Sequence, residues 1–409
     1  MVMKSVYFDH ANSTPVLPEA IAAMHPYLNR HFGNPSSLHR FGDPPRQAIE
    51  QARNQVSRLI NAAPESIIFT SSATESNNLA LKGLAFAHQN RGRHIIVSAI
   101  EHISILEQTR TLKRSGFDVT TLKVDQWGRV DPQKLRETIR PDTILVSVMH
   151  ANYEIGTIQP VEQLAAICRE RGVLFHSDGT AAVGRIPVDV TRLEVDAYTF
   201  SAQSVYGPKG AAVLYLKPGI RINPLIEGGF QEKGRRAGTE NVAAIAGMGR
   251  AAEITGEHLS GWRENMNRLS RRLYQELPAR VERIIFTGHP IDRLPGVVSM
   301  CIEFVEGEAL LLSLDDAGIA AASGSACTAR TLKASHVLLA LGIDHAVAQS
   351  SLLLTLGKDN TDEDIDYFLD RLPSIVSRLR SISPLYARYL RGENPYACKT
   401  GQNHQHEEN

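Results

Sequence analysis

The sequence of 409 residues predicts an α/β fold with two parts: a large, doubly wound, mainly parallel sheet and a smaller α+β unit toward the C-terminus. Two observations support this prediction. Strand-like and helix-like segments alternate between about residues 46 and 255, which is typical of a parallel sheet covered by helices on both faces. From about residue 260 to 385 short apolar strands are mixed with helices, which indicates a second unit.

The first strand of the large unit is predicted at 66–70, where it runs directly into a helix start. Ser72 and Glu75 have the spacing of a capping box, a common signature of a helix N-terminus. Apolar residues with helical periodicity follow at 79–87. Further strands are predicted at 94–98, 143–149, 173–176, 197–201 and 211–216, and a helix at 161–171.

A long helical stretch from about residue 239 leads into the second unit, whose strands are predicted at 297–304, 319–322 and 352–356. We therefore predict a large domain over 16–259 and a small domain built from 1–15 and 260–392. The polar segment 393–409 is predicted to be a flexible tail.

Composition excludes several classes of partner. Lys and Arg together number 44, as do Asp and Glu, so no net charge favours direct binding to nucleic acid or a membrane. The N-terminus lacks the apolar run of a signal peptide, and no stretch has the length of a transmembrane helix. We expect a cytoplasmic protein. No metal site or disulfide is expected, because no CxxC spacing joins the four cysteines Cys168, Cys301, Cys327 and Cys398.

Two strand ends carry residues with chemical potential. The Ser72-Ala73-Thr74 turn lies between a strand and a helix N-terminus, where free N–H groups and the helix dipole favour a phosphate. Asp178 ends another predicted strand, and a carboxylate there is suited to pair with a pyridinium nitrogen. Taken alone, each feature is equally well explained as an ordinary helix cap.

In combination, the motifs are more specific. In order and spacing they resemble the NifS/IscS-type cysteine desulfurases, within the class V aminotransferase group of fold-type-I pyridoxal-phosphate (PLP) proteins, over residues 7 to about 389. The resemblance implies the fold-type-I architecture. The motifs that carry it are GNPSSLH at 33–39, ATESNN at 73–78, EH at 101–102, NYEIG at 152–156, Asp178, YGPKG at 206–210, RAGTEN at 236–241 and SGSACT at 323–328.

The resemblance also implies a cofactor site. Thr74, with the backbone around Ala73, is expected to hold the phosphate of PLP, joined by Ser201. Thr239 is expected to reach the same phosphate from the second subunit of a homodimer. Asp178 is expected to face the pyridine nitrogen.

Three further residues receive roles in the reaction. His102 is expected to stack on the cofactor ring and assist proton transfer, and Asn152 to contact the ring oxygen or the substrate. Cys327, in a run of small residues, is expected to take sulfur from L-cysteine as a persulfide and to pass it to a protein partner.

Four departures from the family pattern fall on this site. Ser204 occupies the position of the Schiff-base lysine, and Gln203 that of the adjacent histidine. Ala181 stands where the family has glutamine, and Leu353 where it has the arginine that binds the substrate carboxylate. Lys209 belongs to a turn that active members also have, so we do not expect it to replace the missing lysine. PLP, or another phosphorylated ligand, is therefore expected to be held without a covalent link if it binds.

Three hypotheses follow. The first is a desulfurase-like protein with impaired or absent standard catalysis, acting as a dimeric scaffold or sulfur acceptor through Cys327. The second is an active desulfurase, or a related lyase, that uses another base or a preformed cofactor adduct. The third is a structural or regulatory module that binds a less charged ligand, for which the apolar residues Leu353 and Phe230 are the supporting features.

Overall fold

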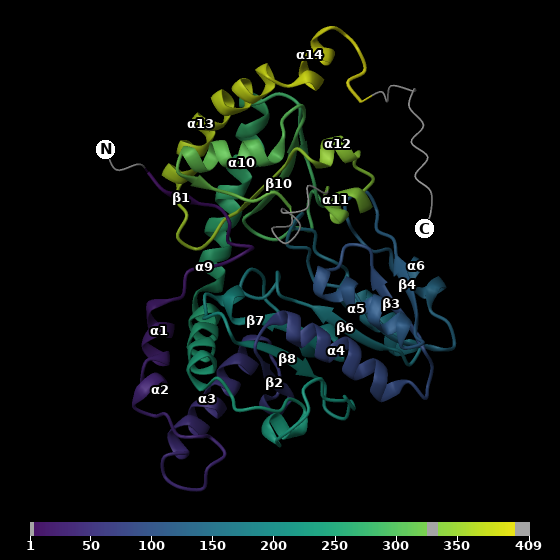
Figure 1. Ribbon diagram of the computed structural model, residues 1–409, viewed down its shortest axis with the longest axis vertical. Helices are drawn as coiled ribbons and strands as arrows, with labels where there is room; N and C mark the ends of the chain where they lie inside the picture. The colour runs from purple at the N-terminus through teal and green to yellow at the C-terminus, as the bar shows by residue number, and fades with distance from the viewer. Residues whose placement is uncertain (1–3, 325–333, 397–409) are drawn as a thin grey trace.

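The computed structural model describes residues 4–324 and 334–396. Its large sheet has seven strands in the order β2-β8-β7-β6-β5-β3-β4 (Figure 1). All neighbours are parallel except β8, which runs antiparallel to both β2 and β7. The mainly parallel sheet is thus confirmed. The strands are β2 (Ile67–Thr70), β3 (His94–Ser98), β4 (Asp118–Leu122), β5 (Thr143–Ser147), β6 (Leu174–Asp178), β7 (Ala197–Ser201) and β8 (Ala212–Leu216).

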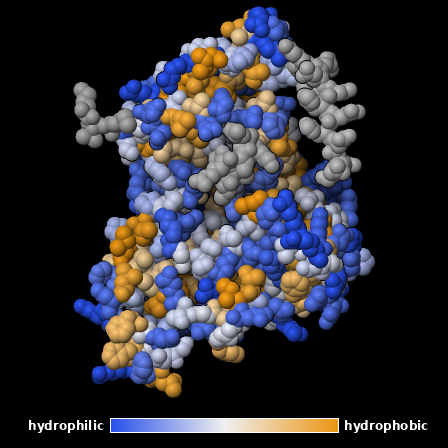
Figure 2. Space-filling view, viewed as in Figure 1, coloured by the Kyte–Doolittle hydropathy of each residue, from blue (hydrophilic) through white to orange (hydrophobic). Residues whose placement is uncertain are grey.

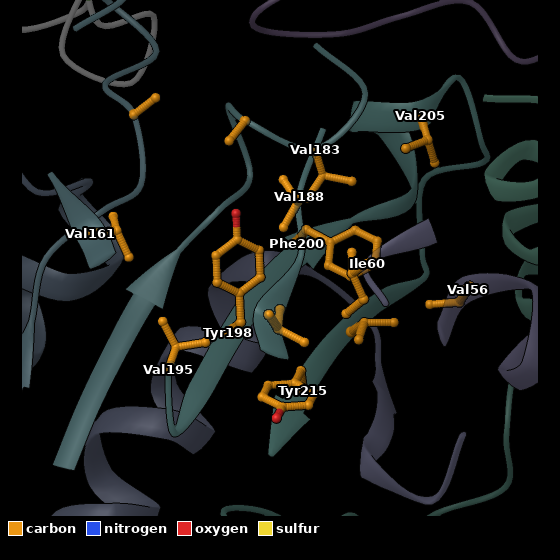
Figure 3. Packing of buried hydrophobic residues seen from close by; sticks show 14 of the residues in the cluster. Val56, Ile60, Val161, Val183, Val188, Val195, Tyr198, Phe200, Val205 and Tyr215 are labelled. Atoms are coloured by element: carbon orange, nitrogen blue, oxygen red, sulfur yellow. The ribbon is translucent and has the colours of Figure 1, made fainter. Parts of the chain in front are cut away.

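Alternate residues of these strands pack into two different apolar layers. Phe69 and Val146 belong to one cluster, whereas their neighbours Ile68 and Leu145 belong to the other. Figure 3 shows part of the first cluster. Both faces are therefore covered, as expected of a doubly wound sheet. Helices α3 (Asp43–Leu59), α7 (Val161–Glu170) and α9 (Val242–Arg280) contribute to the first layer, and α4 (Ala73–His88) and α5 (Ile103–Arg114) to the second.

The predicted strands at 94–98 and 197–201 match β3 and β7 residue for residue. Strand β4 has no predicted counterpart. Only Val119 and Leu122 of its five residues are buried, and it pairs only with β3 at the edge of the sheet. Because Asp118, Thr120 and Thr121 interrupt its apolar residues, the segment lacks the continuous apolar run that marks the inner strands.

The smaller sheet places β10 (Val297–Ile302) between β9 (Ile284–Phe286) and β12 (Ser351–Thr355), all antiparallel. The N-terminal strand β1 (Val6–Tyr7) pairs in parallel with β11 (Ile319–Ala320), so the start of the chain lies with the C-terminal elements. The helices of this part are α10 (Gly307–Asp316), α11 (His336–Ala340), α12 (His345–Ala348), α13 (Asp362–Ser381) and α14 (Pro384–Leu390).

Helix α9, of 39 residues, connects the two parts (Figure 1). Ala244 and Met248 pack in the first layer of the large sheet, and Met266 and Leu273 in the core of the small sheet. The helix crosses position 259/260 without a break, so that domain boundary stays a prediction. Within the two described ranges, no helix is both long and apolar enough to cross a membrane. The remaining elements are α1 (Pro18–Met24), α2 (Pro26–Asn29), α6 (Pro132–Thr138), α8 (Val190–Leu193), and the 3-10 turns η1 (Pro64–Ser66), η2 (Ala202–Val205) and η3 (Gln231–Gly234).

Candidate active site

A cavity of about 470 Å³ opens where several parallel strands end. Its wall includes residues at the carboxyl ends of β2, β6 and β7, together with Met266 of α9 and Val297 of β10. In open α/β sheets this edge is the usual location of a ligand. The wall includes Ala73, Thr74, His102, Asp178 and Ser201, which were singled out from the sequence. It also includes four positions discussed with the departures from the family pattern, namely Ala181, Gln203, Ser204 and Lys209.

The start of α4 directs its first turn toward this cavity. Ser72 is the N-cap, and its Oγ accepts a hydrogen bond from the Glu75 N–H at 3.1 Å. The Glu75 carboxylate does not complete the capping box; it accepts instead from the Ser71 N–H at 2.9 Å and from Arg236 Nε at 2.9 Å. Burial by itself would raise the pKa of Glu75, but the hydrogen bonds from Arg236 and Ser71 hold that pKa below its ordinary value. The helix start therefore combines unpaired N–H groups with an ion pair that fixes it.

The Asp178 carboxylate is held in one orientation from two sides. Its Oδ2 accepts from Asn77 Nδ2 at 2.7 Å, and its Oδ1 accepts from the Thr180 N–H at 2.9 Å. The same Asn77 Nδ2 also donates to Ser104 Oγ at 2.9 Å. Since Asn77 lies on α4, the helix whose N-terminus faces the cavity also positions the carboxylate.

His102 caps α5 with its ring. Nδ1 accepts from the Ser104 N–H at 3.1 Å, and the Ser104 Oγ lies 2.8 Å from the same atom. Because a backbone N–H can only donate, Nδ1 carries no proton in the neutral ring, and the proton lies on Nε2. The ring packs edge-on against Tyr153, with 5.7 Å between centroids. His102 therefore has Nε2 as the atom free for chemistry.

The turn after β7 has no amine at residue 204. Ser204 Oγ donates to the Thr180 carbonyl oxygen at 2.7 Å and lies 3.2 Å from Ser201 Oγ. The backbone is closely packed here, since a Cβ at Gly184 would lie 2.2 Å from the Ser204 carbonyl oxygen. Lys209 also lines the cavity, and its Nζ donates to the Thr14 carbonyl oxygen at 3.3 Å.

Other expected site residues are not brought to the cavity of this chain. Asn152 is fully buried; its Nδ2 donates to the Ile100 carbonyl oxygen and its Oδ1 accepts the N–H groups of residues 154 and 155. Its amide thus shapes a turn, and the expected contact of Asn152 with cofactor or substrate stays a prediction. Thr239 is exposed and does not line this chain's own cavity. Cys327 lies outside the described residues.

The third hypothesis loses its supporting features. Leu353 is 1% exposed and packs in the first apolar layer, and it is not part of the cavity wall. Phe230 is 87% exposed and lies elsewhere on the surface. Two cysteines are buried, Cys168 on α7 and Cys301 in β10.

Two polar residues of the cavity wall were not predicted from the sequence as site residues. Arg185 donates from Nη1 to the carbonyl oxygens of Pro295 and Leu356, at 2.9 and 3.1 Å. His10 is 9% exposed, and its Nδ1 has no hydrogen-bond partner among the described residues. No local pattern marks either residue, because contacts with distant segments place both of them.

The sheet order, the ligand cavity at the strand ends and the helix N-terminus beside Asp178 define the fold-type-I class of PLP-dependent enzymes. Residues 6–368 match the family described as aminotransferase class-V, and the chain belongs to this family.

Within this family, the chain is similar to cysteine desulfurases. The chain is 49% identical over 385 residues to cysteine desulfurase IscS 1 of Archaeoglobus fulgidus, covering 93% of this chain and 100% of that protein. It is 44% identical over 388 residues to cysteine desulfurase IscS of Methanosarcina thermophila, covering 95% and 96%. Among solved structures, a NifS-like protein aligns with a TM-score of 0.86 at 37% identity, covering 92% of this chain and 100% of that one. SspA in complex with cysteine aligns with a TM-score of 0.76 at 32% identity, covering 87% and 100%.

Proposed function

We propose that this chain is a cysteine desulfurase-like protein of sulfur mobilisation whose standard PLP-dependent catalysis is impaired or non-standard. The IscS relatives support the sulfur chemistry, and the related SspA structure with bound cysteine supports L-cysteine as the substrate. The observation that carries the impairment is residue 204. The motif resemblance implies that Ser204 occupies the position of the family's lysine, and its hydroxyl donates to the Thr180 carbonyl oxygen.

The residues of the cavity fit PLP held without a covalent link. Thr74 and the backbone at Ala73 place the positive N-terminal end of α4 at the cavity, and Ser201 lines the same cavity from the carboxyl end of β7. Asn77 holds the Asp178 carboxylate, which we propose faces the pyridine nitrogen. PLP, when bound, supplies an electron sink for an amino-acid substrate. Ser204 has no amine that could form a Schiff base with PLP.

The proposed reaction converts L-cysteine into alanine and leaves its sulfur on Cys327. The Cys327 sulfur bonds to the substrate sulfur as the substrate C–S bond breaks. The electron pair of that bond stays with carbon, which takes a proton. We propose that His102 moves protons at its free Nε2, since Nδ1 is occupied by the Ser104 N–H. A sulfur-accepting protein would then remove the sulfur from Cys327.

The experiment compares the native chain with Ser204→Lys, incubated with PLP and L-cysteine. We expect the native protein to release PLP on dialysis, to retain no pyridoxyl group after borohydride reduction, and to form little alanine. Ser204→Lys should retain the pyridoxyl group at residue 204. Ser204→Ala serves as the matched control and should behave as the native chain. Rapid alanine formation by native protein carrying covalent pyridoxyl would contradict impaired catalysis.

The alternative is a catalytically inactive homologue that acts as a dimeric scaffold, a sulfur acceptor or a ligand-binding module. A sulfur acceptor would require Cys327, so Cys327→Ser separates it from pure binding: loss of sulfur transfer to the chain supports the acceptor. The case for a binder of apolar ligands is weakened, because neither Leu353 nor Phe230 lines the cavity. A cytoplasmic location stays an expectation.

A further inference from the structure

We propose that Arg185, assisted by His10, forms an anion subsite that binds the α-carboxylate of the amino-acid substrate. This inference rests on the proposed function only in taking an amino acid as the ligand. It assigns to Arg185 the charge that the chain lacks at Leu353.

Arg185 carries a positive charge that no carboxylate of the described residues balances. Its Nη1 donates to two backbone carbonyl oxygens and lies 3.7 Å from Met266 Sδ, and no carboxylate lies within ion-pair distance in the described part of the chain. Burial lowers the pKa of its guanidinium. A partly buried guanidinium without a counter-ion is costly, so a bound anion would balance its charge.

Other partly buried arginines near the site show the contrast. Arg53 pairs with Glu232 at 2.8 Å, and Arg236 pairs with Glu75 at 2.9 Å. Both lie outside the wall of the cavity, whereas Arg185 forms part of it. The fold thus places a carboxylate beside Arg53 and beside Arg236, whereas Arg185 in the cavity wall has none within the described residues.

His10 is the second, independent observation. It lines the same cavity, is 9% exposed, and has an unpartnered Nδ1. Its ring is tightly held, since a Cβ at Gly357 would lie 2.3 Å from His10 Cε1. Burial lowers the pKa of His10 to about 4, and the charge of Arg185 contributes to this lowering. Because both residues line the same cavity, one bound anion could contact both.

The position of Arg185 fits a substrate carboxylate rather than a second phosphate. Arg185 follows Gly184, which packs against the Ser204 carbonyl oxygen. Its guanidinium donates a hydrogen bond to the carbonyl oxygen of Leu356, directly after β12, the strand that contains Leu353. It therefore lies between the altered turn and the strand from which the family's arginine would have come. The phosphate already has the start of α4. A planar guanidinium also matches a carboxylate in a bidentate geometry.

The test compares two ligands that differ only in the carboxylate, L-cysteine and cysteamine, by titration calorimetry on the full chain without added PLP. We expect the native protein to bind L-cysteine roughly 10- to 100-fold more tightly than cysteamine, as one charge-assisted contact provides. Arg185→Gln should lose this preference while its cysteamine affinity stays within about 2-fold of native. Arg185→Lys keeps the positive charge but lacks the planar guanidinium, so it should retain only part of the preference for L-cysteine over cysteamine.

Arg380→Lys is the matched control. Arg380 is buried and, like Arg185, donates to backbone carbonyl oxygens, those of Glu303 and Glu282, but it lies outside the cavity. This variant should lose stability and keep the native preference for L-cysteine. If Arg185→Gln does not fold, Arg185→Lys and the native ligand comparison decide the question.

Three results would overturn the proposal: equal native affinity for the two ligands, no binding of either, or an unchanged preference in the Arg185 variants. Inorganic phosphate provides a further arm. Phosphate should bind to Arg185→Gln no more weakly than it binds to the native protein. A loss of phosphate binding in that variant would assign Arg185 to phosphate and contradict the carboxylate subsite. The experiment measures ligand affinity and not turnover. The affinities therefore test the carboxylate subsite even if the protein has no desulfurase activity.

Discussion

At the scale of single residues, Glu101 is a fully buried carboxyl group that directly precedes the site residue His102 in the chain. Its carboxyl group is fully buried, and its Oε1 accepts from Ser98 Oγ at 2.6 Å and from the Met149 N–H at 2.8 Å. Burial raises the pKa of Glu101 to about 8, and the nearby charge of Asp178 adds to this increase. Glu101 is therefore protonated at neutral pH in the folded protein. The sequence motif at 101–102 marks the position but not this protonation state.

This raised pKa predicts that the protein loses stability as pH rises from about 4.5 to about 8. The folded chain binds a proton at Glu101 that the unfolded chain has released, so the free energy of unfolding falls as pH rises toward 8, by up to about 1.4 kcal/mol per pH unit. Glu154, with a pKa raised to about 7 by burial, contributes below that pH. His150 and His176, with pKa values lowered to about 4 by burial, act in the opposite direction only below about 6.5.

Urea unfolding between pH 7 and 8.5 measures the effect. Glu101→Gln mimics the protonated group and should flatten the pH dependence of the unfolding free energy. Glu107→Gln, at an exposed site on α5, should leave the native slope unchanged. A native slope that persists in Glu101→Gln would show that another group titrates in this range.

At the scale of elements, the contact between α3 and α9 depends on a small residue. A Cβ at Gly249 would lie 2.6 Å from Ala52 Cα and 2.7 Å from Ala52 Cβ. Further along α9, a Cβ at Gly256 would meet only Leu59 Cδ1, at an ordinary distance of 3.8 Å. The same helix therefore contains one glycine that packing requires and one that it does not.

Gly249→Ala should destabilise the protein by about 1–3 kcal/mol, because the backbone of α3 cannot yield without moving the helix. Gly256→Ala should be neutral or stabilising by up to about 1 kcal/mol, the gain in helix propensity of alanine over glycine. Denaturant unfolding of both variants measures the difference. Equal effects at the two positions would contradict close packing of α3 on α9.

At the scale of the whole molecule, an apolar surface near the N-terminus is predicted to bind a second copy of the chain. Hydrophobic residues gather over α1 and α2 (Figure 2), and the exposed side chains here and in the following loop include Leu28, Phe32, Leu38 and Phe41. Large exposed apolar patches commonly mark interfaces. The homodimer expected from the family resemblance, with Thr239 reaching the second cavity, would cover such a surface.

The variant Phe32→Asp with Leu38→Asp should shift the protein from dimer to monomer in analytical ultracentrifugation. Ile291→Asp is the matched control, because Ile291 is 82% exposed in the segment after β9 and should not affect assembly. In the monomeric variant PLP should bind more weakly if Thr239 of the second subunit contacts the phosphate. A monomeric native protein would remove this part of the proposal.

Local patterns in the sequence by themselves determined the α/β class, most inner strands and the start of α4 at Ser72, because apolar periodicity and capping depend on neighbours along the chain. The family resemblance grouped Thr74, Asp178 and Ser201, and the structure places all three in the wall of the cavity. Only the tertiary structure decided that Asn152 supports a turn and that Arg185 lines the cavity. Arg185 is placed by carbonyl oxygens more than a hundred residues away, and no local pattern encodes such a meeting.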